Sequence, residues 1–149
     1  RQAAMKPEYY NYLDTLGISP GPVRDKVERV FQICKQICPD EICDMFITEY
    51  MQNEGGRIFE NLFWISPSYL LEAKLFLHQD SFDITPLRDL HYFEIQAQDY
   101  DFQRGTDKSR LTLHARFSDV IVAQLRGSGT NCDQLNRILL THFKPNIKS

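Results

Sequence analysis

Hydrophobic residues recur with two different periods along this chain, and the period changes near residue 40. Before residue 40 they recur every three or four positions, which is the repeat of a helix with one buried face. After residue 40 many of them alternate with polar residues at every second position, which is typical of strands. The pattern therefore predicts a helical part over residues 1–39 and a β-rich part over residues 40–149.

Two helices are predicted in the first part, over residues 7–16 and 22–38. Pro7 suits a first helical turn, and Gly17 stands just past the end of the first helix. The turn at residues 19–22 joins the helices, so we expect an αα-hairpin. The second helix carries an apolar stripe that is too large to leave in water and should pack onto the β-rich part. This stripe contains Val23, Val27, Val30, Phe31, Cys34, Ile37 and Cys38.

The second part is predicted to form a series of antiparallel strands. A hairpin turn is expected at residues 53–56, and the polar stretch 78–89 is expected to be a turn-rich connection. Residues 69–77 could form a helix, because they are rich in Leu, Ala, Glu and Lys, but a strand continues the series of hairpins. The predicted strands are Ile42–Met51, Ile58–Ile65, Tyr69–Leu77, Leu90–Ala97, Arg110–Phe117 and Ile121–Leu125.

A final amphipathic helix is predicted over Asn131–Phe143, with Thr130 or Asn131 as its cap and Pro145 just beyond its end. We expect it to cover the sheet with the face that carries Leu135, Ile138, Leu139 and Phe143.

The connection between the last two strands can be predicted from the faces of their side chains. A two-residue loop would place the apolar face of one strand beside the polar face of the other. A three-residue connection, Ser118–Val120, with a local bulge corrects both faces. Phe117 should then lie opposite Ile121, and Leu113 should lie opposite Leu125.

Composition limits the classes of function. The chain has 149 residues, of which 42% are hydrophobic and 25% charged, and its net charge is −3. These values indicate an ordinary globular domain, and the acidic balance argues against nucleic-acid binding. No apolar run is long enough to span a bilayer. The cysteines, whose spacing does not match a metal site, should be reduced thiols in a cytoplasmic protein. They are Cys34, Cys38, Cys43 and Cys132. We predict no cofactor.

Several antiparallel strands followed by one amphipathic helix resemble the pleckstrin-homology-like fold, a bent, partly open β-barrel capped by such a helix. The resemblance covers about residues 41–144 and rests on the order of the elements. The helical hairpin is not part of that fold and is an addition to it. Together they predict an α+β protein in which the hairpin precedes an antiparallel β-barrel or sandwich with a C-terminal capping helix. The resemblance also implies a non-enzymatic module that binds phosphoinositides, phosphotyrosine, other peptides or partner domains. In members that bind peptides, a ligand strand often adds beside the strand that precedes the final helix, here Ile121–Leu125.

Lipid-binding members carry Lys and Arg where the first strand ends and the second begins. In this chain that stretch, residues 49–57, holds one basic residue, Arg57, and the acids Glu49 and Glu54. Such a stretch is a poor cradle for phosphates, so we expect no specific phosphoinositide binding.

The candidate binding residues lie on one polar face of the strand Arg110–Phe117. Arg side chains suit carboxylates and phosphates, so this row could dock a protein or peptide segment that is acidic or phosphorylated. A solvated sheet face is the alternative interpretation. The row contains Arg110, Thr112, His114 and Arg116, with Arg126 nearby.

An enzymatic alternative rests on Glu72-Ala73-Lys74, which matches the Glu-x-Lys of Mg²⁺-dependent nucleases. In such sites a carboxylate holds the metal ion and a lysine steadies the attacking water. Asp40 or Asp44 could supply the upstream acid. The motif is short and common, so a non-catalytic adaptor remains the favoured interpretation. The four histidines have no partner at ligand spacing and are expected to be isolated.

Overall fold

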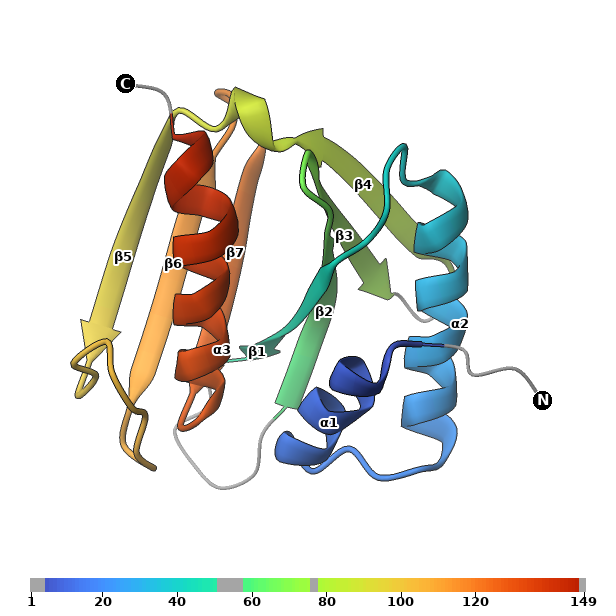
Figure 1. Cartoon of the computed structure of the whole chain (residues 1–149), viewed down its shortest axis with the longest axis horizontal. Helices are drawn as coiled ribbons and strands as arrows, with labels where there is room; N and C mark the ends of the chain where they lie inside the picture. Colours follow the sequence, from blue (N-terminus) through green and yellow to red (C-terminus); the bar gives the residue numbers. More distant parts are fainter. Residues whose placement is uncertain (1–4, 51–57, 76–77, 148–149) are drawn as a thin grey trace.

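The computed structural model describes residues 5–50, 58–75 and 78–147, which form an α+β fold with one four-stranded and one three-stranded antiparallel sheet (Figure 1). The first sheet has the order β1 (Asp44–Tyr50), β2 (Ile58–Ile65), β3 (Tyr69–Leu75) and β4 (Asp80–Pro86). The second has the order β5 (Tyr92–Gln98), β6 (Arg110–Arg116) and β7 (Val122–Ser128). Within the described ranges no ladder joins the two sheets. Of the two predicted arrangements, barrel or sandwich, a closed barrel is therefore not formed by these residues.

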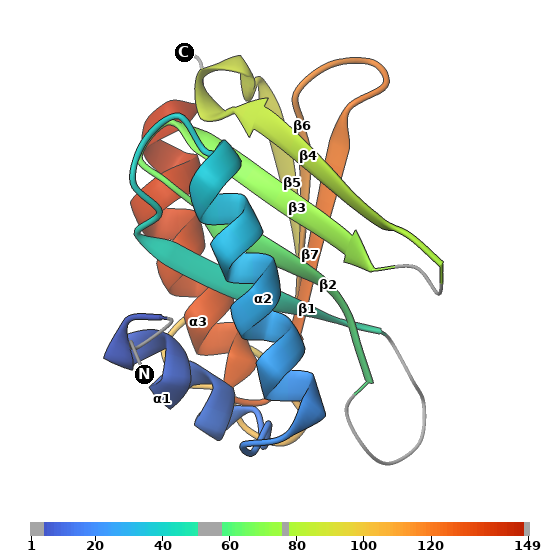
Figure 2. The same ribbon diagram turned by 90° about the vertical axis from the view of Figure 1, so that its right-hand side faces the viewer.

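Helices cover both sides of the four-stranded sheet. The predicted hairpin consists of α1 (Pro7–Thr15) and α2 (Pro22–Ile37), which lie on one face, as Figure 2 shows. The three-stranded sheet and α3 (Asn131–Ile138) lie on the opposite side (Figures 1 and 2). The layers follow from the apolar pattern, because each amphipathic element must bury one face against another.

The predicted packing of the second helix onto the strands is confirmed. Phe31 of α2 is only 6% exposed, and its ring centroid lies 5.0 Å from that of Trp64 in β2. The ring centroid of Tyr9 in α1 lies 5.9 Å from that of the same indole. Trp64 and its neighbour Phe63 point to opposite faces of β2 and both are fully buried, so β2 is covered on both faces here.

The prediction of an irregular connection over residues 78–89 is wrong, because β4 lies there. This strand pairs with β3 along its whole length, from Leu75↔Asp80 to Tyr69↔Pro86. It stands at the edge of the sheet, where polar side chains and a terminal proline are tolerated. Phe82, Ile84 and Thr85 favour a strand, whereas the aspartates and Pro86 do not, so the ladder with β3 decides the structure of this stretch. The strand interpretation of residues 69–77 is confirmed over Tyr69–Leu75.

The final helix is confirmed, but its expected cap is not. The N-cap residue Thr130 makes no side-chain capping bond. The side chain of Asn131 instead bonds to groups in α1 and β1. After Ile138 the helix continues as a π-helical turn, Leu139–Phe143. Its predicted apolar face is buried against the sheets, and this face contains Leu135, Ile138, Leu139 and Phe143.

The predicted register of the last hairpin is confirmed. Leu113 pairs with Leu125, and the N–H of Phe117 donates to the carbonyl of Ile121 at 2.9 Å. Three residues therefore connect the strands. The ladder between Arg110–Arg116 and Val122–Ser128 is regular, and the irregularity lies at the turn, where the N–H groups of both Phe117 and Ser118 donate to the carbonyl of Ile121.

Further expectations concern the cysteines, the membrane and the first hairpin. All four cysteines lie in the described chain as thiols; Cys43 is exposed and the other three are buried. No described helix is both long and apolar enough to cross a membrane. The hairpin turn expected at residues 53–56, and most of the stretch used to predict the absence of phosphoinositide binding, lie outside the described residues.

Candidate functional site

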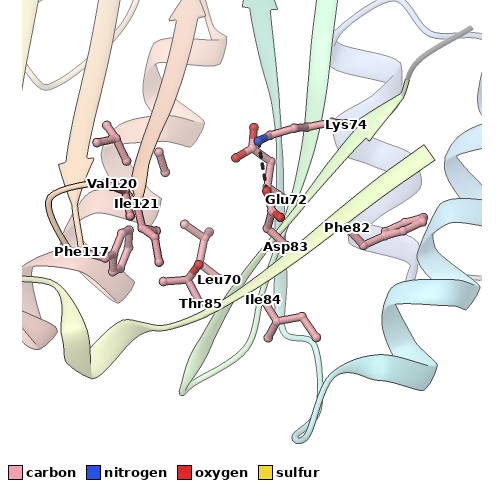
Figure 3. A pocket seen from close by; sticks show the side chains of 12 residues that line it. Leu70, Glu72, Lys74, Phe82, Asp83, Ile84, Thr85, Phe117, Val120 and Ile121 are labelled. Carbon is pink, nitrogen blue, oxygen red and sulfur yellow. Dashed lines mark ion pairs between the residues drawn. The ribbon is translucent and has the colours of Figure 1, made fainter. Parts of the chain in front are cut away.

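A cleft of about 390 Å³ opens between the β3–β4 pair and the turn that joins β6 to β7. Figure 3 shows Val120, Ile121 and Phe117 on one side of it, and Glu72 and Asp83 on the other. The two sides come from different sheets, so the cleft is a place where the sheets do not close upon each other. Strand pairing creates this opening, which no local sequence pattern predicts.

Charged side chains from β3 and β4 line one side of the cleft. Glu72 pairs directly across the ladder with Asp83, so two carboxylates are neighbours. Lys74 reaches Asp83 with an Nζ–Oδ2 distance of 3.1 Å, and this bond raises the pKa of Lys74. Glu72 accepts a hydrogen bond of 2.8 Å from the amide of Asn61. Burial raises the pKa of Glu72, and the nearby Lys74 opposes that effect.

Aliphatic side chains form the opposite side. Val120 is 87% exposed, and its neighbours Ile121 and Val122 are each 46% exposed. Three consecutive β-branched residues at a turn leave apolar surface in water, which is a feature of binding surfaces. The cleft therefore combines an apolar side with a charged one.

The backbone of β7 contributes hydrogen-bonding groups on the side away from β6. In an antiparallel ladder the N–H groups of alternate residues point to opposite sides. The carbonyl of Ile121 accepts a bond from Phe117 at the end of β6, so the backbone groups of the odd-numbered residues point toward β6. The backbone groups of the even-numbered residues of β7 therefore point away from β6. The N–H groups of Arg126 and Ser128 confirm this direction, because they donate to side chains of β1 at 2.8 Å. The ladder with β6 therefore leaves the backbone groups of Val122 and Gln124 facing outward, where Val122 lines the cleft.

The structure places the predicted binding residues on the outer face of the three-stranded sheet. Arg126 lies opposite Thr112, as a shared face requires, and Thr112 is only 8% exposed. The guanidinium of Arg110 donates to the carbonyls of Asp107 and Ser109, and that of Arg116 donates to the carbonyl of Asp119. The row therefore exists on one face of the sheet, but the guanidinium groups of Arg110 and Arg116 are already bonded to carbonyls of their own chain.

Acids accompany the remaining members of the row. Arg126 forms an ion pair with Glu60 of β2 at 3.5 Å. His114 lies across the ladder from Glu94 on one side and from Gln124 on the other. The outer face is therefore mixed in charge, and less basic than the sequence of β6 alone indicates.

The structure separates the residues of the enzymatic alternative. Glu72 and Lys74 do lie on one strand face, beside Asp83. The proposed upstream acids lie elsewhere: Asp44 bonds to Arg137, and Asp40 accepts from the N–H of Ser68. Among the described residues no group of three or more His, Cys, Asp and Glu side chains could hold a metal ion.

An ionic cluster with a buried carboxylate, that of Asp44, connects β1 to the final helix, and no sequence pattern indicated it. Asp44 receives two bonds from the Arg137 guanidinium, at 2.6 and 2.7 Å, and its carboxylate lies 2.9 Å from Nε2 of His142. Burial acts to raise the pKa of Asp44, but the bonds from Arg137 and His142 outweigh it and lower that pKa to about 2. The expectation that His142 is isolated is therefore wrong.

A second buried group fixes α1 and α3 to β1. The Asn131 amide donates to the carbonyl of Ile47 and to Glu49, and its oxygen accepts from the Tyr12 hydroxyl at 2.7 Å. These bonds explain why Asn131 does not cap its helix. They also hold the helical hairpin against the strands, so both parts of the chain form one packed unit.

Comparisons with known proteins add no assignment: no family model, no curated protein and no solved structure matches this chain. The candidate site is therefore defined by the geometry of this chain alone. It consists of an outward-facing strand edge at Val122–Gln124, an exposed aliphatic turn, and a charged side formed by Glu72, Lys74 and Asp83.

Proposed function

We propose that this chain is a non-catalytic interaction domain that binds an extended segment of another protein beside β7. The described chain has a four-stranded and a three-stranded antiparallel sheet followed by a C-terminal helix. This order of elements supports the resemblance to pleckstrin-homology-like domains, which serve as binding modules. The four reduced cysteines support a cytoplasmic location.

The observation that carries the proposal is the outward-facing edge of β7 at Val122–Gln124. An extended peptide can add to such an edge by main-chain hydrogen bonds, while pockets for alternate side chains give specificity. The added strand would lie about 4.8 Å from β7. Its side chains would alternate between the cleft and the outer face of the sheet, since successive side chains of a strand point to opposite faces.

This position explains what the polar row on β6 can and cannot contribute. A strand beside β7 lies two strand spacings, about 10 Å, from β6. Only long side chains on the outer face of the ligand would reach His114 or Arg116. The row therefore acts at the margin of the site, and the backbone of β7 is its centre.

The test is a selection of random peptides of about eight residues, displayed on phage, against the whole chain. We expect peptides with alternating patterns to be enriched on the unmodified chain. Thr85→Trp, which fills the cleft, and Gln124→Pro, which removes an outward N–H, should each abolish binding of the selected peptides. Circular dichroism and thermal melts will establish that each variant is folded.

Two comparisons complete the test. Gln96→Trp adds the same bulk on the outer face at β5 and should leave binding unchanged. The double variant Arg110→Glu/Arg116→Glu should retain at least half of the binding, because those residues lie away from the β7 edge. Loss of binding in this folded double variant, with full binding by Thr85→Trp, would move the site to the polar row and overturn the proposal.

A further inference from the structure

The charges in the cleft are not balanced. Glu72 and Asp83 face each other across the β3–β4 ladder, and the Lys74 ammonium group is close enough to interact electrostatically with both. Like charges directly opposite one another in a sheet destabilise it. Lys74 forms its ion pair with Asp83, whereas the hydrogen-bond partner of Glu72 is the neutral amide of Asn61. The three groups carry a net charge of about −1 near neutral pH, so a second cation would be stabilised here.

The geometry of the cleft favours a cation on a long apolar stem. A ligand strand beside β7 directs every second side chain to the face of Ile121 and Ala123, which line the cleft. Figure 3 shows Ile121 and Val120 across the opening from Glu72 and Asp83. The methylene groups of Lys or Arg can pack on such aliphatic side chains while the charged head reaches the carboxylates.

We infer that the segment bound beside β7 carries a Lys or Arg side chain that enters the cleft and bonds to Glu72 and Asp83; this inference rests on the function proposed above. Arg fits best, because its planar guanidinium can bond to two carboxylate groups at once. The partner segment is therefore basic at one inward-facing position. This chemistry is opposite to the acidic or phosphorylated ligand that the β6 row alone predicts.

The same phage selection tests the inference when it is repeated on charge variants. On the unmodified chain, we expect Lys and Arg to be enriched roughly tenfold over Glu and Asp at one fixed position, as for a charge-assisted bond. On Glu72→Gln/Asp83→Asn this enrichment should disappear, while the alternating pattern persists. Asp107→Asn removes an exposed acid from the loop before β6 and should keep the enrichment, so it serves as the matched control.

A measurement on one selected peptide makes the result quantitative. Replacing its basic residue by Gln should weaken binding roughly tenfold to the unmodified chain and less than twofold to the Glu72→Gln/Asp83→Asn variant. Fluorescence anisotropy of the labelled peptides gives both affinities. Raising the salt concentration should weaken the binding of the basic peptide more than the binding of its Gln version, because screening reduces the attraction between charges.

The outcomes separate this inference from the proposed function. If selected peptides bind beside β7 with no preference between basic and acidic residues, the inference is overturned and the proposed function stands. If no peptide is enriched on the folded chain above the Thr85→Trp variant, both are overturned. An unchanged basic preference on Glu72→Gln/Asp83→Asn would show that other groups recognise the cation, which also overturns the inference.

Discussion

Replacing Phe31 with alanine will lower the free energy of unfolding by about 3–5 kcal/mol, the usual cost of truncating a buried aromatic residue. The ring lies 5.0 Å from the Trp64 indole and 5.8 Å from the Tyr9 ring, between both helices of the hairpin and the sheet. Its removal leaves a cavity that these rigid neighbours can only partly fill. Urea unfolding followed by circular dichroism measures the loss.

A matched control exists on the same helix. Val23 shares the apolar stripe of α2 in the sequence but is 60% exposed. Val23→Ala should therefore change the free energy of unfolding by less than about 0.5 kcal/mol, as for most surface substitutions. A loss below about 1 kcal/mol for Phe31→Ala would show that the helical hairpin contributes little to the core.

Asp44→Asn will lower the free energy of unfolding by about 3 kcal/mol at pH 7, because it leaves Arg137 and His142 without their anionic partner. His142 is buried, so water cannot fully replace the lost interaction. Urea unfolding of both proteins at pH 7 measures the effect. Asp107→Asn, at an exposed position, is the control and should be nearly neutral.

The effect of Asp44 depends on pH in a defined direction. Its pKa is about 2 in the folded protein and 3.8 as the ordinary value, so the folded state favours the ionised form. The stabilisation is fully present above pH 3.8 and is lost as the pH falls through 2. A difference of this size corresponds to about 2.5 kcal/mol. The stability difference between the unmodified chain and Asp44→Asn should therefore narrow from pH 5 to pH 2; a constant difference would contradict the assigned role.

Local pattern was sufficient where burial on one side of an element decides its structure. The apolar stripe of α2 predicted a helix that packs on the sheet, and Phe31 lies in the core as expected. Alternation along β6 and β7 predicted which side chains share a face, and with it the pairing of Leu113 with Leu125. Both predictions depend on the period of side-chain direction, which is a property of the local backbone.

Part of the candidate site was also readable in this way. Alternation on one strand places Glu72 and Lys74 on the same face, which the structure confirms. Their partner Asp83 was not predicted, because the short alternation of Phe82 and Ile84 lies in a polar stretch, ending at Pro86, that was interpreted as a turn-rich connection. That alternation could have indicated a strand, but it does not show that this strand pairs with β3 and places Asp83 opposite Glu72.

The sequence by itself determined the helices, most strands, their buried faces and the register of the last hairpin, because each depends on residues a few positions apart. Only the tertiary structure decided that Asp44 meets His142, that Asn131 bonds to β1 instead of capping α3, and that an opening remains between β3–β4 and β7. Such contacts join residues far apart in the chain. Their energies depend on how whole sheets and helices pack, and no local period of hydrophobicity contains that information.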